Sequence, residues 1–172
     1  MSHVYEEVKR RTELLEKLEL AIPGYRGYKE KELRREADRL IRQHLLDRLR
    51  PAHRNLKSVM PAIAASGDPN LAQLYNQVQA VFDRVIAKLR AASYGYSGFF
   101  DAVKIREAEL DRMLEFDWGL VEAVDRIARA VDSVVKSEPG KMAEALAALR
   151  GELLSFEDLL AKREEVIRGI PA

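Results

Sequence analysis

The chain contains no cysteine, and several classes of protein are excluded for that reason. Disulfide-stabilised scaffolds, thiol nucleophiles, cysteine-ligated zinc sites and iron–sulfur clusters all require cysteine side chains. A chain without disulfide chemistry is typical of an intracellular protein, and we expect a cytoplasmic location.

Long apolar runs and an excess of charge of one sign are also missing. Charged residues interrupt residues 1–22, so no signal peptide is predicted, and no stretch approaches the roughly 18 apolar residues of a membrane span. The 29 Lys and Arg balance 28 Asp and Glu, so the net charge of +1 gives no general attraction to nucleic acid or membranes. The 172 residues, 47% of them hydrophobic, suffice for one domain with its own core, and we expect a single helical-bundle domain over residues 1–172.

Glycine and proline are scarce, with nine and six residues, and stretches of helical periodicity separate them. These stretches predict helices near residues 3–21, 29–63, 69–92, 106–136 and 139–170. Short connections make successive helices antiparallel. The sequence therefore predicts an all-α fold, an elongated up-and-down antiparallel bundle of four long helices plus a short N-terminal helix.

Several residues predict where these helices begin or break. Asp68 is expected to cap the third helix, since its carboxylate accepts free backbone N–H groups and Pro69 at the first position loses no hydrogen bond. Pro51 and Pro61 predict a kink or a break in the second helix. Around Gly151 the heptad repeat typical of a coiled coil continues in phase, so we predict one uninterrupted helix there.

No pattern of catalytic or cofactor-binding residues is present. The chain has only His3, His44 and His53, and none follows a Glu by three residues, as a di-iron or di-manganese bundle site requires. No phosphate-binding loop motif occurs, and Ser97 does not fit the nucleophile-elbow pattern. We therefore expect a non-enzymatic protein without catalytic, cofactor-binding or metal-binding residues.

Two loops of similar composition, GYRGY at residues 24–28 and GYSGF at residues 95–99, combine glycine with aromatic residues. Aromatic rings beside glycine supply contact area at low entropic cost, which suits an interaction surface. An up-and-down path predicts that the two loops are neighbours at one end of the bundle. The candidate interaction surface consists of Tyr25, Arg26, Tyr28, Tyr94, Tyr96, Phe99 and Phe100. The alternative is that these rings close the end of the core.

The segments PGYRGYKEKELRREADRL and ASYGYSGFFDAVKI, which contain these loops, resemble a group of uncharacterised bacterial all-helical proteins. The resemblance covers about a third of the chain. It implies an all-helical fold, and no catalytic residue and no activity follow from it.

Three charged residues, Arg11, Asp117 and Arg163, occupy positions within apolar stripes. An unpaired charge there would be costly, although an arginine at the margin of a stripe can extend to solvent. Because aspartate is too short to do so, we predict that Asp117 pairs with Arg163 or Arg11. A ligand pocket near Asp117 and Trp118 is the alternative use of such a buried carboxylate.

Local charge is uneven although the total is balanced. Residues 24–57 contain 11 Lys and Arg against 5 Asp and Glu, whereas residues 99–138 contain 6 against 10. The basic helix could meet an acidic partner, phosphate groups or anionic lipid, or instead the acidic helix of its own chain or of a second copy. No recognition module accompanies the charge, so nucleic acid is the less favoured partner.

These features lead to one functional hypothesis and two alternatives. The leading hypothesis is a self-associating interaction or scaffold protein that binds a protein partner through the Gly-aromatic loops. One alternative is a small-molecule sensor or carrier with a pocket near Asp117 and Trp118. The other is binding of nucleic acid or anionic lipid through the basic helix at residues 29–57.

Overall fold

The protein is all-α, as predicted from the sequence. The computed structural model describes residues 2–95 and 106–167, and within these ranges it contains no strand. The α-helices are α1 (Ser2–Ala21), α2 (Arg34–Leu56), α3 (Met60–Ser66), α4 (Pro69–Gly95), α6 (Glu107–Val135) and α7 (Met142–Ile167). Short 3-10 helices precede α2, α3 and α7 at Lys31–Leu33, Lys57–Val59 and Pro139–Lys141.

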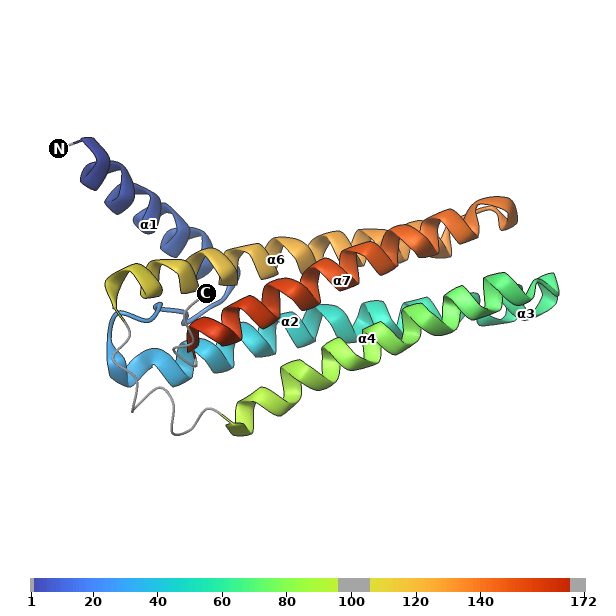
Figure 1. Ribbon diagram of the computed structural model, residues 1–172, viewed down its shortest axis with the longest axis horizontal. Coiled ribbons are helices and arrows are strands. Elements are labelled where there is room, and N and C mark those ends of the chain that lie inside the picture. Colours follow the sequence, from blue (N-terminus) through green and yellow to red (C-terminus); the bar gives the residue numbers. More distant parts are fainter. Residues whose placement is uncertain (1, 96–105, 168–172) are drawn as a thin grey trace.

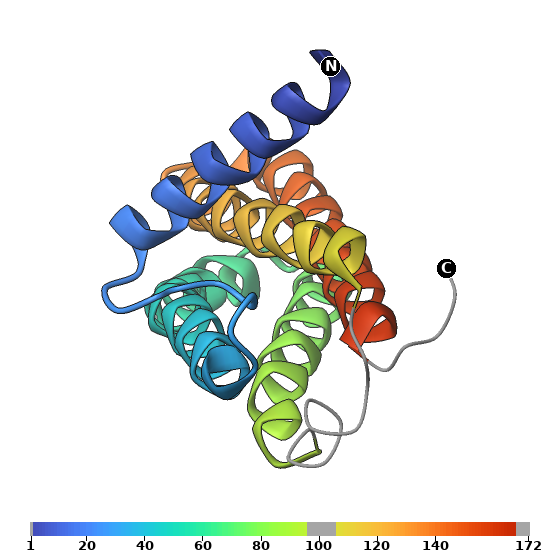
Figure 2. The same cartoon turned by 90° about the vertical axis from the view of Figure 1, so that its left-hand side faces the viewer.

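Helix α2, which α3 continues, runs lengthwise beside α4, α6 and α7 (Figure 1). Helices α2 and α6 run in one direction, and α4 and α7 run in the opposite direction. Helix α6 packs against α7 and α2, and α4 packs against the same two helices. Helix α1 packs on α6 and leaves the bundle at an angle, so its N-terminus points away from the other helices (Figures 1 and 2).

The heptad stripe of α7 forms one wall of the core. Its members from Met142 to Ile167 are all buried: Met142, Leu146, Leu149, Leu153, Phe156, Leu160, Arg163 and Ile167. Helix α7 continues without interruption through Gly151, so the prediction of one helix in this region is confirmed. A side chain every three or four residues keeps facing the bundle because that spacing matches the helical repeat.

The predicted start of α4 is also confirmed. The Asp68 carboxylate accepts hydrogen bonds from the backbone N–H groups of Asn70 (2.9 Å) and Leu71 (3.4 Å). The preceding Gly67 has a φ of +64°, a left-handed conformation that ends α3 and that glycine adopts at little cost.

Of the kink or break predicted at Pro51, the break is absent. Helix α2 continues through this proline, and the regular α-helix ends at Leu56. Leu45 and Leu49 before the proline and Leu56 after it are all buried, and packing of these side chains offsets the lost backbone hydrogen bond. Pro61 lies in the first turn of α3, where a missing N–H donor costs little.

A charged cluster joins α4 to α7 on the surface. Arg84 donates to both carboxylate oxygens of Glu157, at 2.6 and 2.9 Å, and Lys88 donates to the same carboxylate at 3.0 Å. Hydrogen bonds from Arg84 outweigh the opposing effect of burial, and Lys88 adds to them, so the pKa of Glu157 falls to about 2.

We expect this cluster to make the free energy of unfolding fall more steeply as the pH is lowered. The folded-state pKa of Glu157 lies below its ordinary value of 4.5, so its contribution is present above pH 4.5 and is lost as pH falls towards 2. Because Arg84 and Lys88 are exposed, screening limits the contribution to about 1–2 kcal/mol. Chemical denaturation at several pH values should show that Glu157→Gln is less stable than wild type at pH 7, and that the difference narrows towards pH 2. A difference that stays constant over this range would contradict the expectation.

Candidate functional site

A buried cluster of charged and hydroxyl groups lies where α2, α6 and α7 meet the segment after α1. Asp117 of α6 and Arg163 of α7 are fully buried, and the Arg163 Nε donates to Asp117 Oδ1 at 2.6 Å. The Tyr25 hydroxyl donates to Asp117 Oδ2 at 2.7 Å, and the Tyr28 hydroxyl donates to the same oxygen. Arg163 also donates from Nη1 to Asp38 and from Nη2 to the Tyr28 hydroxyl, both at 2.8 Å. Each oxygen of the Asp117 carboxylate therefore has at least one donor inside the protein.

The charges of this cluster stabilise one another in the absence of solvent. Burial alone lowers the pKa of the Arg163 guanidinium, but the nearby Asp117 and Asp38 carboxylates raise it well above its ordinary value. Burial and the Asp117 charge both raise the pKa of Tyr25 well above its ordinary value. Burial also raises the pKa of Tyr28, against the opposing effect of Arg163. Both phenols thus stay protonated and donate to the carboxylate.

The sequence analysis predicted the pairing of Asp117 with Arg163, named Tyr25 and Tyr28 for a different role, and missed Asp38. The predicted pairing of Asp117 with Arg163 is present, whereas Arg11 lies elsewhere and pairs with Asp111 at 3.5 Å. The Arg11 side chain is only partly buried. Asp38 was missed, although its spacing of three from Ile41 places it on the buried side of α2.

The first Gly-aromatic loop does not present its rings to solvent. Tyr25 and Tyr28 are 1% and 2% exposed and pack edge to face, with ring centroids 6.1 Å apart. The prediction that Tyr25 and Tyr28 belong to an exposed interaction surface is therefore wrong. Their hydroxyl groups form hydrogen bonds with Asp117 and Arg163 inside the protein. Arg26, between them, is exposed.

The second Gly-aromatic loop lies largely outside the described residues. Tyr94 belongs to the last turn of α4, and Tyr96, Phe99 and Phe100 fall between the described segments. The end of α4 lies at the same end of the molecule as the start of α2 (Figure 1). Contact between the two loops stays a prediction.

The pocket considered near Asp117 and Trp118 has no support in the geometry. Asp117 is 0% exposed and its carboxylate is occupied by Arg163 and the two tyrosines. Trp118 is half-buried against the core, and the ammonium group of Lys17 lies 5.7 Å from its ring centroid. Trp118 thus contributes to the packing of α1 on α6.

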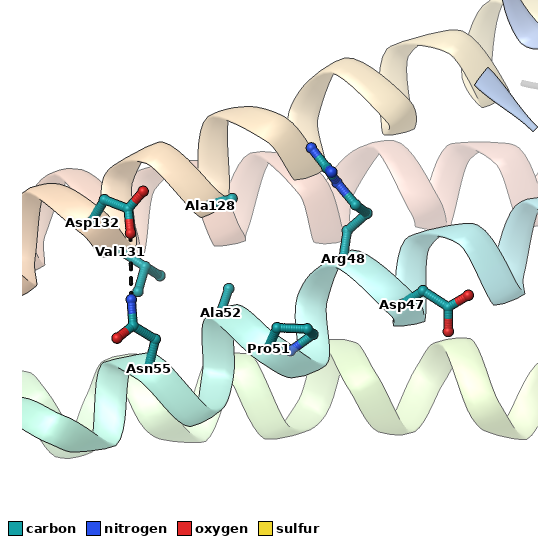
Figure 3. Close-up of a pocket in the computed structure, with 8 residues that line it drawn as sticks. All are labelled: Asp47, Arg48, Pro51, Ala52, Asn55, Ala128, Val131 and Asp132. Carbon is teal, nitrogen blue, oxygen red and sulfur yellow. Dashed lines mark hydrogen bonds between the residues drawn. The ribbon is translucent and has the colours of Figure 1, made fainter. Parts of the chain in front are cut away.

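Polar side chains of the basic helix α2 bond to the acidic helix α6 of the same chain. Arg48 pairs with Asp125 of α6, and Asn55 donates to Asp132 of α6 at 3.3 Å. These contacts match the alternative in which the basic helix meets the acidic helix of the same chain. Beside them, α2 and α6 enclose an open groove of about 450 Å³ (Figure 3). Its lining includes Ala52, Ala128 and Val131 together with the polar residues Asp47, Arg48, Asn55 and Asp132, of which Asn55 and Asp132 bond to each other.

Among the residues that the structure describes, the largest group of exposed apolar side chains lies on the first half of α1. Val4 is 66% exposed, Tyr5 68% and Val8 45%, and every residue from Ser2 to Arg10 is classed as exposed. Val4 and Val8 continue the stripe of Leu18, which is buried against the bundle. The apolar stripe of α1 thus extends beyond the part of the bundle that covers it.

The crossing of α1 over α6 leaves a groove on each side of the contact. One groove of about 500 Å³ is lined by Val4, Val8, Leu14 and Ala108 together with charged side chains that include Arg10 and Glu115. The other, of about 290 Å³, runs beside the first Gly-aromatic loop and includes Arg26 and Gly27. Val8, Arg11 and Asp111 lie at both grooves, so the two grooves adjoin one another. We refer to Val4, Tyr5, Val8 and these two grooves as the α1–α6 junction.

The first Gly-aromatic loop fixes the geometry of the junction. Gly27 is buried beneath α1 with a φ of +75°, and a Cβ atom there would lie 3.2 Å from Leu15 and 3.5 Å from Leu114. Only glycine permits both the left-handed conformation and this close approach at low cost. This contact and the hydrogen bonds of Tyr25 and Tyr28 to Asp117 hold the loop against both α1 and α6.

Comparisons of the chain with protein-family models, curated proteins and solved structures found no match. Within residues 2–95 and 106–167, no group of three or more His, Asp or Glu side chains is arranged to hold a metal ion. None of the helices described above is both long enough and apolar enough to span a membrane. The α1–α6 junction is the candidate functional site.

Proposed function

We propose that the protein is a non-enzymatic interaction protein that binds a protein partner at the α1–α6 junction. The observation that supports this most strongly is the exposure of Val4, Tyr5 and Val8 on a helix that leaves the bundle. The proposed interaction surface lies on α1, next to the first Gly-aromatic loop, and not on the aromatic rings of that loop. A cytoplasmic location stays a prediction from the sequence.

The physical state of α1 supports a partner at this surface. An isolated helix shorter than about 12–15 residues is marginal in water, and most helical stability in proteins comes from packing of an apolar face. Residues 2–10 of α1 are all exposed, so their apolar stripe has little packing of its own. A partner that covers Val4, Tyr5 and Val8 removes apolar surface from water and stabilises the helix at the same time.

The two alternative functions have weaker support. Both oxygens of the buried Asp117 carboxylate already accept hydrogen bonds from side chains of the protein, which argues against a ligand pocket at Asp117. Several basic residues of α2 pair within the chain, as Arg39 does with Glu36 and Arg42 with Asp38. This internal pairing lowers the charge available to nucleic acid or anionic lipid.

Site-specific photo-crosslinking in cells tests the proposal. Replacing Tyr5 with p-benzoylphenylalanine keeps an aromatic ring at the junction and adds a reactive carbonyl group. We expect irradiation to give a discrete crosslinked product. The matched control places the same residue at Met60, which is 55% exposed and lies on α3 at the opposite end of the bundle.

A product from Tyr5 but none from Met60 is the expected result, and the mass of the product identifies the partner. Equal labelling at both positions, or no product at Tyr5 at any expression level, would contradict the proposed function.

A further inference from the structure

We infer that the smaller groove of the α1–α6 junction binds a small molecule that carries one apolar chain or ring and one carboxylate group. This groove, of about 290 Å³, is lined by three separate parts of the chain, which are α1, α6 and the connection between α1 and α2. The inference goes beyond the proposed function, because it assigns a small ligand to one part of the junction and does not require the protein partner.

The helical walls of this groove carry apolar side chains. Helix α1 contributes Val8 and Leu15, and α6 contributes Leu110 and Leu114. Residues seven or four positions apart project from the same side of a helix, so each pair forms one continuous apolar wall. An apolar group placed between the two walls is removed from water, which is favourable in proportion to the apolar area that it buries.

Two cationic residues at the groove supply the charge that selects an acidic ligand. Arg26 and Lys29 both line the groove, and both are exposed. Among the residues that the structure describes, neither side chain forms an ion pair or a hydrogen bond. The third cation at this groove, Arg11, already pairs with Asp111, which lines the groove as well. Two positive charges beside the apolar walls are therefore not neutralised by the groove itself, and they favour a ligand with an anionic group.

The size of the groove limits the ligand to a small molecule. One turn of an α-helix, about 10 Å across and 5.4 Å long, occupies roughly 420 Å³, which is more than the groove holds. Its volume of about 290 Å³ lies instead at the lower end of the range for small-molecule pockets. A carboxylate is a compact head group, and an arginine guanidinium binds it with two parallel hydrogen bonds. Arg26 is thus suited to orient the acid group, and Lys29 adds a second positive charge.

Titration of the full chain with octanoate, followed by two-dimensional ¹H–¹⁵N NMR spectra, tests the inference. Three matched probes separate the contributions to binding: 1-octanol has the same chain without a charge, octylammonium has the same chain with the opposite charge, and acetate has the charge without the chain. We expect one saturable site for octanoate. Each of the other probes should bind at least about tenfold more weakly, because each lacks either the apolar burial or the attraction to the cations.

The same spectra locate the ligand on the molecule. The shifted backbone amide signals should belong to residues around the groove, such as Thr12, Gly27 and Lys29. Ile63 lies on α3 at the opposite end of the bundle, so its amide signal should not move (Figure 1). A localised pattern of this kind distinguishes a defined site from adsorption of the alkyl chain over the whole surface.

Substitution of the two cations adds a second readout. Arg26→Gln and Lys29→Gln should each raise the dissociation constant of octanoate about tenfold and leave that of 1-octanol unchanged, because only the charged head group loses its partner. Lys31→Gln is the matched control. Lys31 is exposed like Lys29 and lies two positions further along the chain, but it does not line the groove. It removes the same unit of charge and should leave octanoate binding within about twofold of wild type.

Octanoate binding that does not saturate by about 10 mM, or equal losses for Arg26→Gln and Lys31→Gln, would overturn the inference. Shifts spread over the whole molecule would overturn it as well, since they would show non-specific adsorption only. If octanoate does not bind but Arg26→Gln weakens the Tyr5 crosslink, the groove belongs to the protein partner and the proposed function stands without a small ligand. Absence of any Tyr5 crosslink would instead remove the proposed function and would leave octanoate binding unaffected.

Discussion

Replacing Asp117 with alanine is expected to lower the free energy of unfolding by about 3–5 kcal/mol, the range for removal of one partner from a buried ion pair. The substitution takes the acceptor from Arg163, whose Nε donates to it at 2.6 Å, and from the hydroxyls of Tyr25 and Tyr28. Asp38 remains bonded to Arg163 at 2.8 Å, but one carboxylate then faces a fully buried guanidinium without the second. Urea denaturation followed by circular dichroism measures the change.

Asp125→Ala provides the matched control. Asp125 also lies on α6 and also pairs with an arginine, Arg48, but both side chains are exposed. Exposed pairs contribute about 0–1 kcal/mol, so the control should lose little. A leucine at position 117 restores volume but no acceptor, and we expect it to be destabilising as well. If Asp117→Ala and Asp125→Ala lowered the free energy of unfolding equally, burial would not be the reason for the contribution of the Asp117 cluster to stability.

Replacing Phe156 with alanine is expected to lower the free energy of unfolding by about 3–5 kcal/mol, through lost apolar burial and the cavity that remains. Phe156 is 0% exposed and continues the buried stripe of Leu149, Leu153 and Leu160 on α7. It lies just after the Gly151–Ser155 segment, so a large loss also requires that α7 keeps its register through that glycine.

Leu154→Ala is the control for Phe156. Leu154 lies two residues away on the same helix but is 44% exposed. The expected loss there is below about 1 kcal/mol, because little apolar surface is uncovered. If Phe156→Ala lost no more than Leu154→Ala, the face of α7 assigned to the core would be wrong.

The charged residues of the stripes show how far sequence reasoning reaches for the candidate site. Asp117 stood out because a short acidic side chain in an apolar stripe requires a partner, and Arg163 was the matching cation on another stripe. Arg11 has the same sequence signature but pairs with the partly exposed Asp111. The distinction depends on where α1 leaves the bundle, which the periodicity of α1 does not encode.

For the loop at residues 24–28, the sequence indicated the backbone conformation but not the direction of the aromatic rings. Glycine beside aromatic residues indicates a special conformation, and Gly27 has one, with a φ of +75°. Whether the rings face solvent or the core is decided by what lies beneath them. Here Asp117 and Arg163 form hydrogen bonds with the hydroxyl groups of Tyr25 and Tyr28, so both rings lie in the core. The exposed apolar side chains lie instead on α1, at Val4, Tyr5 and Val8.

The sequence by itself determined the all-α class, the start of α4 at Asp68 and the continuous buried stripe of α7, because caps and a repeat of three to four residues act locally. Only the tertiary structure decided that α2 continues through Pro51, that the tyrosine hydroxyls converge on Asp117, and that the first half of α1 lies outside the bundle. These features depend on contacts between residues far apart in the chain, such as the 92 positions from Tyr25 to Asp117, and no local pattern specifies them.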